Sequence, residues 1–250
     1  MKPTPDVEAK IDALCRTLGD ALGGAVVCIA VYGSAAGDGF APGHSDVNLL
    51  VVLRDVGFAD LRLIGDTLRR SAPKELRVAT PLVVTPSFLR DARDSYPIEL
   101  ADIRDRHRVV VGEDVVASIA VSADRLREQA EREARGKLLK LRSLVLHRPG
   151  DAEAKTALAS TVPTFEVIER GLLRAWKAER SDAQGSTPRG ADLFEEVERR
   201  QGVSMKSLAR IARLRDDGGT WPAGADLDEL IGAVLREIEA LVAFIDGSGS

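Results

Sequence analysis

Cysteine, histidine and long apolar runs are scarce in this sequence, and each scarcity removes a class of protein. There are only 2 cysteines and 3 histidines. Neither Cys15 nor Cys28 has metal-ligand spacing to a second Cys or His, so we predict two reduced, buried thiols and no zinc site. No run approaches the roughly 18 apolar residues that span a bilayer, and the N-terminal stretch lacks the apolar core of a signal peptide. We therefore expect a cytoplasmic protein with no membrane partner.

An excess of positive charge is also missing. The formal net charge of -4 at pH 7 gives no overall basic field, so nucleic acid is not expected as a partner. What the chain does contain, 44% hydrophobic and 30% charged residues, is ordinary for a globular protein. Its 250 residues are enough for one large or two small domains.

Two short apolar runs rich in β-branched residues stand out, Val26–Tyr32 and Val47–Leu53. Both are bounded by Gly, Pro, Asp or Ser, which favours buried strands over helices. A glycine-rich loop separates them. We predict a strand, a loop and a second strand here, and the remaining chain is organised around this unit.

The polar residues of this stretch lie where the two strands meet the loop. Gly33-Ser34 directly follows the first strand, and after eleven residues comes Asp46-Val47-Asn48. Because strand side chains alternate, Asp46 and Asn48 are expected to share one face, beside the glycine turn. The simpler alternative is a strand-ending turn at Gly33 and a turn acid at Asp46.

Strands and helices alternate up to about residue 120, which predicts an α/β domain with a mixed sheet over residues 1–120. Residues 96–107 carry no clear pattern. The expected helices are 5–22, 60–70 and one beginning at Thr85-Pro86, and the expected strands besides the first two are 76–84, interrupted by Pro81, and 108–111.

Helical periodicity dominates after residue 121. We predict an antiparallel helical bundle over residues 121–250, with a linker at 181–190. Pro163 should kink or split the second of its helices, and Phe165 and Trp176 should face the core. The expected helices are 124–147, 151–179, 192–201, 204–215 and 226–245.

The spacing of Gly33-Ser34 and Asp46-Val47-Asn48-Leu49 resembles the signature of the nucleotidyltransferase superfamily of DNA polymerase β. That signature is hydrophobic-Gly-Ser, about ten residues, then Asp-hydrophobic-Asp/Glu-hydrophobic. An α/β head followed by helices is also the layout of aminoglycoside and minimal bacterial nucleotidyltransferases. The resemblance implies an α+β fold, in which a nucleotidyltransferase-like mixed sheet precedes an antiparallel helical bundle.

The resemblance also implies a chemistry, two-metal phosphoryl transfer. Gly33 and Ser34 match the turn that holds the nucleotide's phosphates, and Asp46 matches the first Mg²⁺ ligand. Ser45, directly before Asp46, is a further candidate for nucleotide binding. Asn48 takes the place of the second catalytic carboxylate. His44 either contacts a phosphate or acts as a base, or it is a solvated loop histidine.

The sequence departs from the family pattern at the metal ligands. Asn48 supplies no charge and cannot bridge two cations as a carboxylate does. The third acid is missing from the run 76–84, which reads LRVATPLVV. An acid from elsewhere would have to take its place, and the nearest along the chain are Glu75, Asp94, Glu99 and Asp102.

Two functions follow, and the sequence leaves open whether the protein is an enzyme. The first is binding of a nucleoside triphosphate with Mg²⁺ and nucleotidyl transfer to a small hydroxylated molecule or a protein. The second is a catalytically inactive pseudoenzyme, in which the fold serves as a binding or interaction module within a homodimer or with a partner protein. A toxin–antitoxin component is a third alternative.

Overall fold

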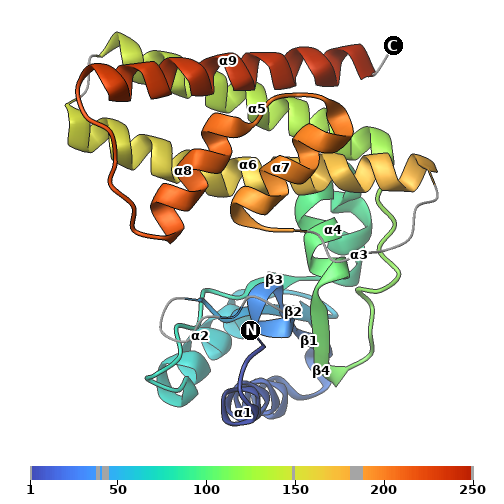
Figure 1. Cartoon of the computed structure of the whole chain (residues 1–250). Helices are drawn as coiled ribbons and strands as arrows, with labels where there is room; N and C mark the ends of the chain where they lie inside the picture. Colours follow the sequence, from blue (N-terminus) through green and yellow to red (C-terminus); the bar gives the residue numbers. More distant parts are fainter. Residues whose placement is uncertain (1, 38–39, 41–44, 148–149, 181–187, 249–250) are drawn as a thin grey trace. The chain divides into compact units, whose positions relative to one another are not determined.

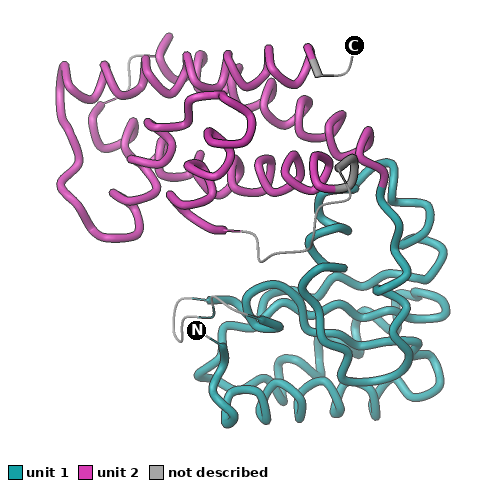
Figure 2. Tube along the Cα trace, turned by 45° about the vertical axis from the view of Figure 1, so that its right-hand side comes forward, with its two compact units in different colours: residues 1–121 teal, residues 122–250 magenta. Residues whose placement is uncertain are grey.

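The computed structural model describes residues 2–37, 40, 45–147, 150–180 and 188–248. The chain divides into two compact units (Figure 2), which we call the sheet unit, Met1–Val121, and the helical unit, Ser122–Ser250. Within the described residues, no helix is both long and apolar enough to cross a membrane.

In the described residues, the sheet unit is built on four strands (Figure 1), which lie in the order β3-β2-β1-β4. Strand β1 pairs antiparallel with both β2 and β4, and β2 pairs parallel with β3. The mixed sheet expected from the sequence is therefore confirmed. The strands are β1 Val26–Tyr32, β2 Asn48–Leu53, β3 Leu82–Val84 and β4 His107–Gly112.

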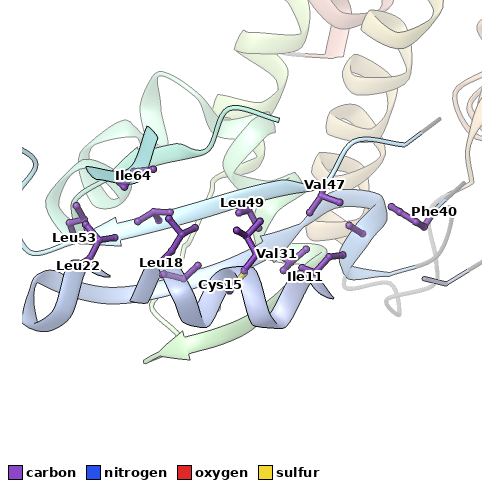
Figure 3. Close-up of a cluster of buried hydrophobic side chains, with 14 residues drawn as sticks. Ile11, Cys15, Leu18, Leu22, Val31, Phe40, Val47, Leu49, Leu53 and Ile64 are labelled. Atoms are coloured by element: carbon purple, nitrogen blue, oxygen red, sulfur yellow. The ribbon is translucent and has the colours of Figure 1, made fainter. Parts of the chain in front are cut away.

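One face of the sheet is covered by α1 (Pro5–Leu22) and α2 (Phe58–Ser71). Helix α1 starts where expected, because Pro5 occupies its first turn and the Thr4 hydroxyl accepts a hydrogen bond from Val7 N at 3.4 Å. Figure 3 shows the apolar cluster between helices and sheet, which includes Ile11, Cys15, Leu18, Leu22, Val31, Leu49, Leu53 and Ile64.

The opposite face packs against α3 (Pro86–Asp91), α4 (Pro97–Asp105) and the segment after β4. Helix α4 lies in the stretch 96–107, which carries no clear pattern in the sequence. Cys28 belongs to this second cluster, and both cysteines are buried and free, as predicted. Members of the second cluster include Cys28, Ala30, Leu50, Val52, Leu89, Leu100, Ile103, Val116 and Ile119.

The predicted strand 76–84 is the largest correction in the sheet unit. Only β3 is a strand, and the earlier part contributes a single parallel bridge between Val47 and Val78. Pro81 precedes β3 and has no N–H to donate to a ladder, which explains why the pairing is interrupted there. Helix α2 begins two residues earlier than predicted, because the N–H of Gly57 donates to Asp60 Oδ2 at 2.9 Å.

The helical unit consists of helices in its described part, as predicted. Helix α5 packs against α6 and α9, while α7 packs against α8 and α6. Their bounds are α5 Ala123–Leu146, α6 Asp151–Arg180, α7 Gly190–Gln201, α8 Lys206–Asp216 and α9 Ala225–Ser248.

Helix α6 is not split at Pro163, so that part of the expectation was wrong. Pro163 is exposed. Val162 and Phe165, on either side of it, are fully buried and hold the helix in the core. Phe165 is a core residue, as expected. Trp176 is only half-buried and carries the Arg200 guanidinium over its ring, 4.7 Å from the centroid.

Candidate functional site

The two halves of the sequence motif meet at one end of the sheet. Tyr32, the last residue of β1, pairs with Asn48 at the start of β2 and with His107 at the start of β4. Gly33 follows Tyr32 directly. Residues that are distant in the chain are therefore brought to a single edge, which we call the sheet end.

Gly33 begins a one-turn 3₁₀ helix, η2, which spans Gly33–Ala36. Its φ angle is 76°, a conformation that residues with a Cβ rarely adopt. Its N–H donates to the carbonyl oxygen of Arg106 at 2.9 Å, and Gly37 N donates to Ser34 O at 3.3 Å. The N–H of Ser34 comes next and has no acceptor inside so short a helix, so among the described residues it is the first donor of the turn left for a ligand.

Asn48 lies against this turn. A Cβ built on Gly33 would lie 3.4 Å from Asn48 Nδ2, so the amide reaches the backbone of the turn. An amide nitrogen donates hydrogen bonds, whereas the carboxylate that the family pattern places here only accepts them. The site therefore offers a donor to a phosphate where a carboxylate would repel it.

Asp46 is separated from Asn48 by the fully buried Val47. Its carboxylate forms an ion pair with Arg77, and Arg77 Nε lies 3.0 Å from Asp46 Oδ1. Two backbone hydrogen bonds hold the segments together, from Val47 N to Arg77 O at 2.7 Å and from Ala79 N to Val47 O at 3.0 Å. Asp46 thus faces a cation that belongs to the chain itself.

The two serines of the candidate site are both half-buried. Ser34 is the second residue of η2, and Ser45 immediately precedes Asp46. The structure thus places both beside residues of the sheet end. His44 lies outside the described residues.

The candidates for a third acid are occupied elsewhere or lie on other elements. Glu75 pairs with Lys10 of α1 at 2.8 Å, and this hydrogen bond lowers the pKa of Glu75. Asp102 pairs with Arg106 at 3.6 Å. Asp94 ends the short helix η3 (Ala92–Asp94), and Glu99 is exposed on α4.

The side chains of the sheet end do not fit a two-metal centre. Two Mg²⁺ ions need several anionic oxygen ligands, and bridging carboxylates above all. Here Asp46 already has Arg77 as counter-ion and Asn48 is neutral. Among the residues that the structure describes, no group of three or more His, Cys, Asp and Glu side chains is placed to hold a metal ion.

His107 is largely enclosed, with 10% of its side chain exposed. Its Nδ1 lies 2.8 Å from Arg104 O and its Nε2 lies 3.0 Å from Asp114 Oδ1. Each ring nitrogen thus faces an oxygen acceptor. Burial raises the pKa of Asp114, but hydrogen bonds from Ala117 N, His107 and Val116 N outweigh it, and the pKa is lowered overall.

Sequence reasoning missed two residues of this edge, Arg77 and Arg106. Arg77 carried a signal, because a basic residue stands in the run where the family pattern requires an acid. Arg106 contacts Gly33 through its backbone carbonyl, which every residue has. Its side chain therefore could not have predicted this contact.

No family model and no curated protein matches the sequence. Among solved structures, the chain is similar to the crystal structure of spectinomycin adenyltransferase AAD(9) from Enterococcus faecialis with ATP and spectinomycin. The TM-score is 0.54 at 8% sequence identity, and the match covers 92% of this chain and 98% of that chain. The nucleotidyltransferase-like α+β fold that the motif implied is thereby confirmed.

Proposed function

We propose that this chain binds a nucleoside triphosphate at the sheet end, with the phosphates against the turn Gly33–Ala36. The observation that carries the proposal is the contact of the Asn48 amide with the positive-φ Gly33 turn, on a fold shared with an adenyltransferase. Backbone N–H groups of a glycine turn are suited to phosphate oxygens. The similar structure contains ATP, which supports a nucleotide as the ligand.

Titration of the purified full chain with ATP, GTP, CTP and UTP tests this proposal. In ¹⁵N-resolved NMR we expect the amide resonance of Ser34 to shift on titration, and adenosine without phosphates to shift it far less. Gly33→Ala should weaken binding, since alanine tolerates the 76° φ poorly. Near-ultraviolet circular dichroism checks that this variant keeps its fold. No binding of any of the four nucleotides would remove the proposal.

Binding without nucleotidyl transfer is the form of this function that the side chains support best. Asn48 in place of a carboxylate and the Arg77 counter-ion on Asp46 leave no acid set for paired metal ions. The protein then acts as a nucleotide-responsive interaction module. Its association, as a homodimer or with another protein, would then depend on whether nucleotide is bound.

Nucleotidyl transfer to a small hydroxylated molecule or a protein is the second candidate. Two observations favour it, the likeness to an adenyltransferase and the presence of Asp46 two residues before Asn48. Catalysis of this kind would have to proceed with fewer carboxylates than a two-metal site normally uses.

Labelled nucleoside triphosphates with Mg²⁺ or Mn²⁺ separate the two candidates. We expect no labelled product from the wild type, and we expect Asn48→Asp to restore part of the missing acid set. Measurable wild-type transfer that Asp46→Ala abolishes would instead establish the enzyme. Asp124→Ala is the control, because Asp124 is an exposed acid that pairs with Arg127 on α5, in the helical unit.

A further inference from the structure

Arg77 occupies the segment that should bring the third acid to the sheet end. The parallel bridge between Val47 and Val78 fixes this segment beside the start of β2. The two hydrogen bonds between Val47 and residues 77 and 79 keep Arg77 level with Asp46. The position of Arg77 is therefore set by backbone pairing and does not depend on its side chain.

The guanidinium and the carboxylate lie together at the surface of the sheet unit. Arg77 Nε is 3.0 Å from Asp46 Oδ1, and the two side chains are 61% and 47% exposed. A divalent cation placed on Asp46 would be repelled by Arg77 at close range. The charge that a metal ion would neutralise is already neutralised by the chain.

The two departures from the family pattern act in the same direction. Replacing a carboxylate by Asn48 removes a negative charge and adds a hydrogen-bond donor beside Gly33. Arg77, where an acid is expected, removes another and adds a positive charge. Three carboxylates repel a polyphosphate unless metal ions intervene, whereas Asp46, Arg77 and Asn48 together carry no net charge and are rich in donors.

An arginine is chemically suited to bridge a carboxylate and a phosphate. Its planar guanidinium carries five N–H donors and pairs with Asp46, with Nε 3.0 Å from Oδ1. A guanidinium matches the geometry of phosphate oxygens and forms charge-assisted hydrogen bonds with them. Asp46 would then orient Arg77 for the ligand.

We propose that Arg77 replaces Mg²⁺ at this site, so that the protein binds the triphosphate in its metal-free form. This inference rests on the proposed binding of a nucleotide at the sheet end. It assigns Arg77 as the residue that determines whether free or magnesium-bound nucleotide is preferred.

Isothermal titration of the full chain with ATP tests the inference, once with EDTA and once with excess Mg²⁺. We expect binding with EDTA that is at least as tight as with Mg²⁺. Arg77→Met keeps the length of the side chain but removes its charge and donors, and should weaken binding in EDTA by about tenfold. Arg77→Lys keeps the charge without the planar fork and should fall between the two.

Arg69→Met is the matched control. Arg69 is also an exposed arginine in the sheet unit, paired with Asp66 on α2, with side chains 72% and 43% exposed. Its binding should equal that of the wild type. Binding that requires Mg²⁺, or Arg77→Met that binds as tightly as wild type in EDTA, overturns the inference while nucleotide binding stands. Absence of binding in both buffers overturns the proposed function itself.

Discussion

Asp46 in the sheet unit and Glu169 in the helical unit are acids in opposite surroundings. Asp46 is exposed and faces Arg77 at 3.0 Å. Glu169, on α6, is fully buried, and neither of its carboxyl oxygens has a hydrogen-bond partner among the described residues. Burial raises the pKa of Glu169 to about 8. The sheet unit compensates its acid with a cation, whereas the helical unit holds its acid as a neutral carboxyl.

This difference separates what the two acids do. A charge paired at the surface contributes little to stability and remains available to a ligand. An acid buried without a partner affects the stability of its unit instead, because ionising it costs the full desolvation of the charge. Mutations at the two places should therefore change different properties of the molecule.

Glu169→Gln should give the largest change, and the change should grow as the pH rises from about 5 to about 8. The pKa of Glu169 is raised from 4.5 to about 8, so the folded state binds the proton more tightly than the unfolded state. The stability from this group is complete below about pH 4.5 and is lost as the pH rises to about 8. Glutamine mimics the protonated form at every pH. The variant should match wild type near pH 5 and exceed it by roughly 3–5 kcal/mol near pH 9.

Urea unfolding of both proteins from pH 5 to pH 9 measures this difference. Subtracting the two curves cancels the titration of all other groups. Glu239→Gln is the control, because Glu239 is 46% exposed and pairs with Arg142 at 2.8 Å. Its difference curve should stay nearly flat. If the difference curve for Glu169→Gln is flat as well, Glu169 is not a neutral acid in the folded protein.

Glu237→Ala should give the next largest effect, because Glu237 is a buried acid that does have partners. Its two carboxyl oxygens accept from Ser207 N at 2.7 Å and Leu208 N at 3.1 Å, which caps the start of α8. Alanine removes both acceptors, and we expect a loss of about 2–3 kcal/mol. Thermal unfolding at pH 7 measures it. Glu239→Ala, two residues further along α9, should cost less than about 1 kcal/mol.

Asp114→Asn tests a paired acid of the sheet unit. Its hydrogen bonds lower the pKa of Asp114 in the folded state, so the stability from this group exists above its unfolded value of about 3.8 and is lost as the pH falls. The variant should lose about 1 kcal/mol at pH 7, since asparagine accepts from Val116 N but loses the charge that meets His107. Acid unfolding curves of the two proteins should converge near pH 3.

The sequence predicts best where periodicity and local signals agree. The bounds of β1, the start of α1 and the meeting of Gly33 with Asn48 follow from alternation, capping and the glycine turn. The same rules failed for 76–84, where an apolar run looked like one strand but Pro81 breaks the pairing. They also failed at Pro163, where burial on both sides outweighs the cost of one missing hydrogen bond.

The candidate site was predictable in its position and not in its charge. Gly33, Asp46 and Asn48 are spaced by local rules, so their convergence follows from pairing two strands. The ion pair between Arg77 and Asp46 depends on a parallel bridge across thirty residues, which no local pattern specifies. The contact between His107 and Asp114 likewise depends on the path of the chain after β4.

Arg77→Met should have the smallest effect on stability, although it should have the largest effect on nucleotide binding. An exposed ion pair typically contributes less than about 1 kcal/mol, and the backbone bonds to Val47 do not involve the lost side chain. We expect thermal unfolding within about 0.5 kcal/mol of wild type, equal to that of Arg69→Met. A loss of 2 kcal/mol or more would make Arg77 a structural partner of Asp46. The two acids would then no longer differ in kind, because substitutions at both places would change the stability of the unit concerned.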